Sequence, residues 1–535
     1  MATCKWKGKY TVNQKRKLSV LLSFTVLASM IAGCSTQNAS SSSAETSTDT
    51  TSAATSMNVS ESAAQERVDL TFLCQINVDT EGYDVNDNPY INYLRERHNL
   101  NIEIISESAN YSTKVSTMMA SGDLPDYVQL PKAQYFQYAQ EGLLLQLDDL
   151  LNETDYPNLM AGVDEKFWDY SRVDGKIYAI PFSRYDTTPY ISYARKDWLE
   201  NLGIDATELT TVEDYHQMLR AFTLEDPDGN GVNDTYGLCG ASNDTAASYS
   251  VGERYLGMLF QDAFNAANMF VKDEKVYPNY LNDGYKDYLA FLAQLYQEGI
   301  IVPDYITKTQ KQTEEEFMNG KFGVLNLFWS LSELSEMRDN LVPLTPPEKL
   351  DGSGRSTYVY QTPVRHFIGI TTQCEHPELI LKLYDWSETD EGAEFVHAGV
   401  EGYDWDRVDG KLVIREDRVG INWAWRFITL GHQKAKVDDQ LMEILTQSWG
   451  DVAIDQLKLS EEFGSNDPLY VSSPTFSELA DYDLDTYVSQ YRNQVIMGQK
   501  DVEATWDEFV DGWYAAGGDK WVELYTNWYH TSYVG

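Results

Sequence analysis

Residues 68–76, VDLTFLCQI, form an apolar run of strand length that decides the class of fold. The next segment, INYLRERHNL at 91–100, has the composition of a helix, and NIEIISES at 101–108 alternates between apolar and polar residues as a strand does. Residues 111–130, YSTKVSTMMASGDLPDYVQL, indicate a helix, a turn and another short strand. Strands that alternate with helices are typical of an α/β fold, so we expect a mostly parallel sheet flanked by helices.

The same alternation continues through the middle of the chain. An amphipathic helix is expected at 288–301, YLAFLAQLYQEGII, and a strand at 321–328, KFGVLNLF. A further strand, HFIGITT at 366–372, precedes a helix at 376–387, HPELILKLYDWS. The 535 residues are 42% hydrophobic, which is enough for two or more lobes that each bury a core.

Residues 1–33 have the pattern of a secretion signal. A basic segment, KWKGKYTVNQKRK, precedes an apolar run of about 15 residues, LSVLLSFTVLASMIA, which is shorter than the roughly 20 residues of a membrane-spanning helix. The run ends in Ile31-Ala32-Gly33-Cys34, which resembles a bacterial lipobox with Ile31 in place of the usual Leu. The resemblance implies cleavage after Gly33 and attachment of acyl chains such as palmitate at Cys34. The alternative is an ordinary signal peptide in which Cys34 is coincidental.

Residues 34–65 are rich in Ser, Thr and Ala and contain almost no large apolar side chain. Such a segment cannot bury enough apolar surface to offset the entropy lost on ordering its backbone. We therefore expect a disordered tether that holds a folded body away from a membrane surface.

Net charge and cysteine usage exclude several classes of protein. The formal net charge of −42 disfavours binding to nucleic acids and to anionic lipid headgroups. Besides Cys4 and Cys34, the cysteines are Cys74, Cys239 and Cys374, which are scattered and lack CxxC spacing. Three thiols allow at most one disulfide, so the chain is not a disulfide scaffold, and the sequence leaves their pairing open.

Several motifs, in a fixed order, resemble bacterial extracellular solute-binding proteins of the family 1 type. They are ASGDLPDYVQL (120–130), EGLLLQLDDL (141–150), DGKIYAIPFSRYDTTPYISYARKDWLENLGI (174–204) and TVEDYHQMLRAFTLEDPDGNG (211–231). FMNGKFGVLNLFWS (317–330) and GVEGYDWDRVDGKLV (399–413) resemble the larger saccharide- and alginate-binding lipoproteins of carbohydrate ABC transporters. The resemblance covers residues 68–410 well and the remainder more loosely.

The resemblance implies a two-lobed, periplasmic-binding-protein-like fold of type II, with a ligand cleft between the lobes. Lobe one is expected at 66–187, with a return segment at 363–410. Lobe two is expected at 188–362, and the C-terminal helical region, 411–535, is assigned mostly to lobe two. Such a cleft is where α/β proteins usually bind ligands.

Residues 226–234, DPDGNGVND, place oxygen-bearing groups at alternate positions, as in the calcium loop of an EF-hand. Gly231 occupies the sixth position, where a sharp turn is needed, but Gly237 stands at the twelfth, where a bidentate Glu is usual. We expect a structural calcium ion here, and the alternative is a metal-free loop of Asx turns. The candidate ligands are Asp226, Asp228, Asn230, the carbonyl of Val232, and Asp234.

Sugars present flat C–H faces, which stack on aromatic rings, and hydroxyl groups, which bind carboxylates, amides and Arg. Candidate ligand-binding residues are therefore aromatic and polar side chains in segments that the resemblance places at the cleft. They are Asn77, Asp79, Gln129, Tyr185, Asp186, Trp329, Glu401, Tyr403, Trp405 and Trp425. For most of the Trp residues, a place in the core is the competing interpretation.

The sequence favours a binding protein over an enzyme. It contains no GxSxG elbow, no HExxH zinc motif and no GxxxxGK[ST] phosphate loop, so an ATPase would have to be a separate chain. We expect a monomer, lipid-anchored at the extracellular face of the cytoplasmic membrane, that delivers an oligosaccharide to the permease subunits of an ABC importer. The alternatives are a surface glycoside-acting enzyme, or the same fold binding a peptide or another small solute.

Overall fold

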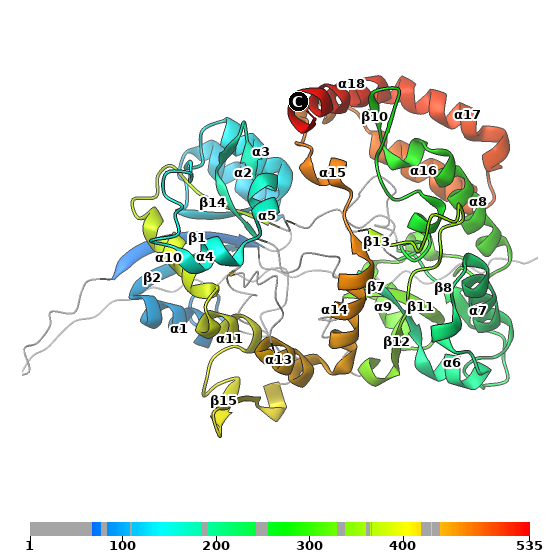
Figure 1. The fold of residues 1–535 in the computed structure, drawn as a ribbon, viewed down its shortest axis with the longest axis horizontal. Coiled ribbons are helices and arrows are strands. Elements are labelled where there is room, and N and C mark those ends of the chain that lie inside the picture. Colours follow the sequence, from blue (N-terminus) through cyan, green and yellow to red (C-terminus); the bar gives the residue numbers. More distant parts are fainter. Residues whose placement is uncertain are drawn as a thin grey trace, which may run out of the picture. The chain divides into compact units, whose positions relative to one another are not determined.

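The computed structural model describes residues 67–75, 83–107, 110–182, 190–241, 255–328, 337–359, 364, 366–418, 428, 430 and 439–534 (Figure 1). The predicted signal peptide, Cys34 and the tether up to residue 65 lie outside these residues. Among the residues described, no helix is both long enough and apolar enough to cross a membrane. The chain builds two main sheets, and a separate hydrophobic core accompanies each of them.

The first sheet has five strands in the order β2-β1-β3-β14-β6. These are β1 (Val68–Gln75), β2 (Leu100–Glu107), β3 (Tyr127–Leu130), β6 (Ala179–Phe182) and β14 (His366–Ile370). β1 is parallel to β2 and β3, as the alternation of strands and helices predicts. β14 is antiparallel to both β3 and β6, so β6 runs in the same direction as β3 and the sheet is mixed.

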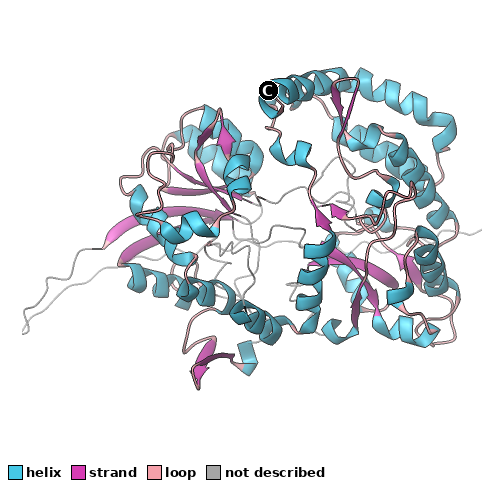
Figure 2. Ribbon diagram, viewed as in Figure 1, coloured by secondary structure: helices cyan, strands magenta, loops and turns pink. Residues whose placement is uncertain are grey.

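Helices accompany the strands of this sheet (Figure 2). They are α1 (Pro89–His98), α2 (Tyr111–Ser121), α3 (Lys132–Gln140), α4 (Pro157–Gly162), α5 (Glu165–Tyr170), α10 (Pro377–Ser387) and α11 (Asp390–Ala398), with a small hairpin of β4 (Arg172–Val173) and β5 (Lys176–Ile177). The sequence starts α1 in the usual way: the Asn88 side chain accepts from two backbone N–H groups, and Pro89 holds the first helical position. Phe72, Val128 and Ile368 are fully buried in the shared core, so distant segments build one body.

The second sheet has four strands in the order β12-β7-β11-β8. They are β7 (Tyr190–Arg195), β8 (Tyr236–Leu238), β11 (Phe322–Phe328) and β12 (Leu341–Pro343), with helices α6 (Lys196–Leu202), α7 (Val212–Leu224), α8 (Asp283–Gln297) and α9 (Gln310–Met318). β11 is parallel to β8 and antiparallel to β7. β7 is also antiparallel to β12, so β8, β11 and β12 run in one direction and β7 runs against them. The expected α/β fold is confirmed.

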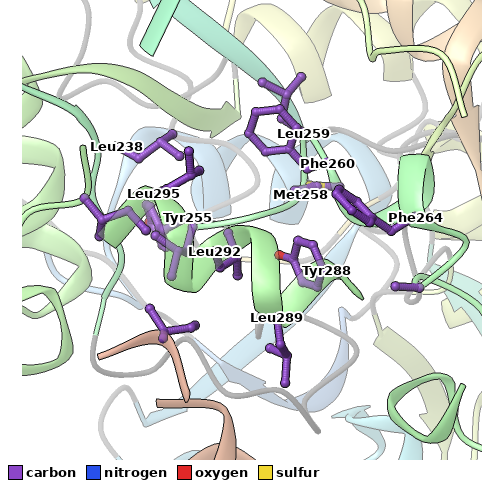
Figure 3. Packing of buried hydrophobic residues seen from close by; sticks show 14 of the residues in the cluster. Leu238, Tyr255, Met258, Leu259, Phe260, Phe264, Tyr288, Leu289, Leu292 and Leu295 are labelled. Carbon is purple, nitrogen blue, oxygen red and sulfur yellow. The ribbon is translucent and has the colours of Figure 1, made fainter. Parts of the chain in front are cut away.

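One face of α8 contributes several side chains to the core of the second body (Figure 3). Tyr288, Leu289, Leu292 and Leu295 of this helix are completely buried, as the amphipathic pattern predicts. The Tyr288 hydroxyl lies 1.4 Å from where a Cβ atom at Gly257 would stand. Any side chain at that position would therefore displace Tyr288 from the core.

Most of the C-terminal helices pack on this second core, whereas α13 packs on α11, α14 and β16. The C-terminal helices are α13 (Asp439–Trp449), α14 (Asp451–Phe463), α15 (Pro468–Ser472), α16 (Leu484–Ile496), α17 (Val502–Trp513) and α18 (Asp519–Trp528), followed by a π-helical turn at Tyr529–Tyr533. Short two-stranded sheets are formed by β9 (Phe270–Lys272) with β10 (Lys275–Tyr277), β13 (Tyr358–Val359) with β17 (Gly464–Ser465), and β15 (Trp405–Val408) with β16 (Lys411–Ile414). Cys74, Cys239 and Cys374 are present as thiols, the first two buried.

One polar contact joins an element of the first core to an element of the second. Lys132, the first residue of α3, donates from its ammonium group to the backbone oxygens of Tyr470 (3.1 Å) and Val471 (3.2 Å) in α15. Tyr135 of α3 belongs to the first core, and Leu469 of α15 belongs to the second. The positive charge also stands at the carboxyl end of a helix, where the helix dipole favours it.

The carboxylate of Asp467 begins α15 and is completely buried. It accepts hydrogen bonds from the backbone N–H groups of Met269 (2.6 Å) and Leu469 (3.0 Å). Burial raises the pKa of Asp467 to about 6, against the effect of these hydrogen bonds and of Lys132. Burial likewise lowers the pKa of Lys132 to about 7, against the attraction of Asp467. The contact therefore holds two groups that titrate near neutral pH.

The raised pKa makes the stability of this body depend on pH in a defined direction. The folded state binds the Asp467 proton more tightly than the unfolded state does, so protonation of Asp467 stabilises the fold. This stabilisation is complete below pH 4 and is lost as the pH rises through 6. The Asp467→Asn variant cannot titrate there. We expect the unfolding free energy of the wild type, relative to Asp467→Asn, to fall by up to about 3 kcal/mol between pH 4 and pH 7.

Chemical denaturation at pH 4, 5.5 and 7 measures this difference. Asp273→Asn serves as the control, because Asp273 is exposed in the β9–β10 turn and the variant loses the same charge. A difference between the wild type and Asp467→Asn that stays constant with pH would show that Asp467 ionises normally in the folded state.

Candidate ligand-binding site

The strand directions bring several strand ends of the first sheet to one edge. β1, β3 and β6 run the same way, so their last residues, Gln75, Leu130 and Phe182, lie at the same edge of the sheet. We call it the carboxyl edge. In α/β proteins, ligands bind outside such an edge, where chain segments leave the strands. The candidate site is therefore built outward from this edge.

Gln129, a predicted ligand-binding residue, lies at this edge, but its side chain is only 2% exposed. Its Oε1 atom accepts from the backbone N–H of Gln75 at 3.1 Å and so ties the end of β3 to the end of β1. The Tyr111 hydroxyl also links β1 to β3 at this place, because it hydrogen-bonds the backbone oxygens of Leu73 (2.9 Å) and Gln129 (2.6 Å). In this structure, the Gln129 side chain mainly holds the ends of β1 and β3 together.

A group of five side chains lies close to the carboxyl edge: Tyr83, Tyr90, Tyr403, Asp404 and Arg418. We call it the tyrosine–arginine cluster. Tyr90 lies in the first turn of α1. Because α1 connects the end of β1 to the start of the parallel strand β2, it runs opposite to the strands, and its first turn lies on the carboxyl side of the sheet. Tyr403 and Asp404 follow α11, and Arg418 follows β16. Three separate parts of the chain therefore meet at one point.

Asp404 organises the cluster. Its side chain is 1% exposed, and its Oδ1 atom accepts from the Tyr90 hydroxyl (2.9 Å) and from Nη2 (2.8 Å) and Nε (3.0 Å) of Arg418. Its Oδ2 atom accepts from the backbone N–H of Val400 at 2.8 Å. A carboxylate with this many donors is well satisfied despite its burial.

Arg418 is held on two sides. Asp404 binds one edge of the guanidinium, and the guanidinium carbon lies 4.7 Å from the centre of the Tyr403 ring. The hydroxyl groups of Tyr403 and Tyr83 are hydrogen-bonded to each other. The planar cation therefore has one fixed orientation and little side-chain entropy left to lose.

Tyr90 and Tyr403 keep their hydroxyl protons at neutral pH, and Arg418 keeps its charge. Burial and the nearby Asp404 raise the pKa of Tyr90 far above its ordinary value. Burial and the hydrogen bond with Tyr83 raise the pKa of Tyr403 to about 12. Burial opposes the charge of Arg418, but the hydrogen bonds to Asp404 outweigh it, so the pKa of Arg418 rises above its ordinary value. The cluster thus offers neutral phenols beside a permanent cation.

Of the other predicted residues nearby, Glu401 is exposed and Trp405 is not. The Glu401 carboxylate lies 4.0 Å from Nε of Arg407. Trp405 is 3% exposed, donates from its indole N–H to the backbone oxygen of Gly399 (3.1 Å), and packs in a small core with Leu412. Its ring is packed in this small core in the structure, and its role as a sugar platform stays a prediction.

Six predicted ligand-binding residues lie outside the described part of the chain: Asn77, Asp79, Tyr185, Asp186, Trp329 and Trp425. Sequence reasoning missed Tyr83, Tyr90, Asp404 and Arg418. No motif contains them together, because Tyr90 and Asp404 are separated by 314 positions. The only local signal was GVEGYDW, which includes Tyr403 and Asp404.

The predicted calcium loop lies between α7 and β8 in the second body, before the strand begins. The Asp226 carboxylate accepts from the backbone N–H groups of Asn230 (3.0 Å) and Gly231 (2.9 Å), which curls the loop. The Asn230 side-chain amide donates to Asp228 (2.7 Å) and Asp234 (3.4 Å). Each of the three predicted Asp ligands thus accepts a hydrogen bond from Asn230.

This donor set fits calcium in its chemistry, because every group can offer a hard oxygen. Among the described residues, however, no three His, Cys, Asp or Glu side chains are close enough together to hold a metal ion. The Asn230 side chain turns its amide nitrogen, rather than its oxygen, toward Asp228 and Asp234. Thr235, just after the loop, donates instead to the backbone oxygen of Phe222 at 2.8 Å.

The sequence is similar to a known protein family and to characterised relatives. The profile of the family described as bacterial extracellular solute-binding protein matches residues 90–393, more than half of the chain. Lipoprotein LipO of Bacillus subtilis strain 168 is 25% identical over 465 residues, which are 79% of this chain and 85% of LipO. YtcQ of the same strain, named a polygalacturonan/rhamnogalacturonan-binding protein, is 23% identical over 434 residues, 77% of this chain and 82% of YtcQ.

Solved structures share the fold. The ABC-transporter substrate-binding protein FusA of Streptococcus pneumoniae, in complex with kestose, aligns with a TM-score of 0.65 at 20% identity, over 87% of this chain and 99% of FusA. The alginate-binding protein AlgQ2, solved without its calcium ion, aligns with a TM-score of 0.63 at 20% identity, over 87% of this chain and 98% of AlgQ2. The expected two-lobed fold is confirmed, and the chain belongs to the bacterial extracellular solute-binding protein family.

Proposed function

We propose that this protein captures an oligosaccharide outside the cell and delivers it to the permease of an ABC importer. The tyrosine–arginine cluster carries the proposal. It places the half-buried ring of Tyr403 beside the oriented cation of Arg418 at the carboxyl edge of the first sheet. A ring for C–H faces and a fixed donor for hydroxyl oxygens are the two elements of a sugar site. The names of YtcQ and FusA support the same class of ligand.

Binding without turnover agrees with the chemistry of the cluster. Its buried carboxylate, Asp404, is occupied by Tyr90, Arg418 and the backbone of Val400. A general acid or nucleophile needs access to the substrate, which this arrangement does not offer. The protein would act as a monomer whose two lobes close on the ligand and favour the closed state through the added contacts.

A thermal-shift screen of residues 65–535 with neutral oligosaccharides, acidic oligosaccharides and short peptides tests the proposal. We expect one saccharide class to raise the melting temperature, because a ligand that binds only the folded state stabilises it. Chromatography of the bound glycan after a long incubation should recover it unchanged. A response to peptides alone, or release of shorter glycans, would refute the proposal.

The contribution of Tyr403 gives a sharper test with the identified glycan. Tyr403→Ala removes the ring that supports both the ligand and Arg418, so we expect affinity to fall about tenfold or more, equivalent to ~1.4 kcal/mol. Tyr403→Phe retains the ring and should bind within about threefold of the wild type. Isothermal titration calorimetry measures both variants. Val408→Ser, at an exposed position on β15, is the control that should bind normally.

We further propose that the protein is anchored through Cys34, with the signal at residues 1–33 removed and residues 34–65 serving as the tether. The lipobox-like sequence and the name of lipoprotein LipO support this. A single acyl chain holds a protein only weakly, so at least two chains are expected at the mature N-terminus.

Replacing the anchor cysteine should release the protein. In bacteria that express Cys34→Ser, we expect the protein in the culture supernatant or in the aqueous phase of a detergent partition, whereas the wild type follows the membrane fraction. Metabolic labelling with palmitate provides the second measurement and should label the wild type but not Cys34→Ser. Cys374→Ser is the matched control and should remain labelled; equal partitioning of Cys34→Ser and the wild type would exclude the anchor.

We propose, finally, that the loop from Asp226 to Asp234 binds a structural calcium ion. The hydrogen bonds that Asp226, Asp228 and Asp234 each accept from Asn230 support this, as do the titles of the AlgQ2 and FusA structures, which mention calcium and an EF-hand. Asp226, Asp228, Asn230, Asp234 and the Val232 carbonyl would hold the ion. Its role would be to link the end of α7 to the start of β8.

Removal of calcium should lower stability while leaving the ligand site intact. After chelation and dialysis, we expect calcium at about 100 times its dissociation constant to restore about 2.7 kcal/mol of unfolding free energy. Asp228→Ala should abolish both this effect and the heat of calcium binding, whereas Asp273→Asn should retain them. Glycan affinity should change less than twofold in Asp228→Ala, because the loop precedes β8 and lies away from its carboxyl end.

A further inference from the structure

One cation joins the two bodies where α3 meets α15. Nζ of Lys132 donates to the backbone oxygens of Tyr470 (3.1 Å) and Val471 (3.2 Å), and it lies 5.2 Å from the centre of the Tyr470 ring. α15 also packs against α5 of the first body, so this short helix touches both bodies. Any movement that separates α3 from α15 removes these contacts and returns the ammonium group of Lys132 to water.

The groups around Lys132 compensate its charge only in part. Both hydrogen-bond acceptors are neutral backbone oxygens. Among the described residues, the charged group that acts on Lys132 is the carboxylate of Asp467, which belongs to the second body and accepts hydrogen bonds from its backbone. The titratable groups that interact with Asp467 or Tyr470 instead are Asp485, Tyr525 and Tyr533. Removing the ammonium group from water therefore has a cost that these partners offset only in part.

This cost makes the contact sensitive to protons. Burial lowers the pKa of Lys132 from its ordinary 10.5 to about 7, against the attraction of Asp467. When α3 and α15 separate, water surrounds Lys132 and its pKa returns toward the ordinary value, so the separated state binds the proton more tightly. The contact is therefore weakened as the pH falls from 10.5 toward 7, by up to about tenfold in population for each pH unit.

Asp467 acts in the same direction at lower pH. Its carboxylate attracts Lys132 while both groups are charged, and protonation near its pKa of about 6 removes this attraction. Because its hydrogen bonds come from Met269 and α15 of its own body, Asp467 keeps its place when Lys132 leaves. Acid therefore weakens the contact through both groups, and mild alkali strengthens it.

We propose that Lys132 and α15 form a proton-sensitive latch between the two bodies, which tightens above neutral pH and loosens below it. The latch acts on the equilibrium between closed and separated bodies, which exists without any ligand. Its effect on glycan affinity rests on the proposed function, because a ligand that both bodies hold binds more weakly when the closed state is less populated.

The tyrosine–arginine cluster adds no pH dependence of its own through its phenols or its guanidinium. The pKa values of Tyr90, Tyr403 and Arg418 are all raised, so these groups keep their protons throughout the range from pH 6.5 to pH 9. A change of affinity in this range that depends on Lys132 therefore reports on the latch.

Distances between two spin labels in the ligand-free protein test the latch. Residues 65–535 form a unit separate from residues 1–64. This unit carries labels at Glu96→Cys in α1 and Glu200→Cys in α6, two exposed positions, and the partly exposed Cys374 is replaced by Ser. We expect one distance at pH 9 and a second distance in addition at pH 6.5, with the ratio of closed to separated protein falling by about tenfold or more.

Lys132→Met removes the titrating group and nearly keeps the length of the side chain. We expect one distance at both pH values and a glycan affinity that differs by less than about twofold between them, whereas the wild type should lose about fivefold or more at pH 6.5. Lys176→Met, at an exposed position on β5, loses the same charge and should follow the wild type. If Lys132→Met does not fold, Lys132→Gln, which keeps a donor for the two carbonyls, replaces it with the same expectation.

The outcomes separate the latch from the proposed function. Wild-type distances that do not change with pH refute the latch, and so does a change that Lys132→Met retains. If the distances change as expected but no glycan binds, the latch stands and the proposed function fails. Equal glycan affinity of the wild type at pH 6.5 and pH 9 refutes control of the site by the latch and leaves the proposed function intact.

Discussion

The shared direction of β1, β3 and β6 is the constraint on which the rest of the structure depends. It sends three chain segments out of the sheet at one edge, and it places the first turn of α1 there as well. Side chains from distant positions can meet at such an edge without any irregularity in the sheet. The tyrosine–arginine cluster is a direct result, because α1 supplies Tyr90 and the segments after α11 and β16 supply its partners.

Within that frame, one buried carboxylate fixes the geometry of the site. Asp404 is almost inaccessible to solvent, so leaving it without donors would be costly, and Tyr90, Arg418 and the Val400 backbone supply them. The same bonds hold Arg418 flat against Tyr403. A rigid cation and ring suit a solute-binding protein, since little ordering is needed on binding.

The sequence predicts the local elements well and the long-range pairing less well. Periodicity identified β1, β2, β3 and their helices, because burial on one face leaves a pattern in neighbouring residues. Periodicity carries no information on strand direction, so the antiparallel pairing of β14 with β3 and β6 was not predicted. Trp405 shows the same limit for the site: an aromatic residue at a promising position can point into a core, and only the tertiary packing decides between the two. Arg418 lies in no motif and became visible only through its contact with Asp404.

The first sheet is completed by a strand that arrives late in the chain. β14 fills the space between β3 and β6, yet it follows β6 by more than 180 positions, and the second sheet lies between them in the sequence. During synthesis, the strand edges of β3 and β6 that pair with β14 therefore have no partner until residues 366–370 emerge. Unpaired strand edges are prone to aggregation. An exported chain of this design needs its N-terminal half kept from premature pairing, which ties its yield to export speed and to chaperones that shield nascent strands.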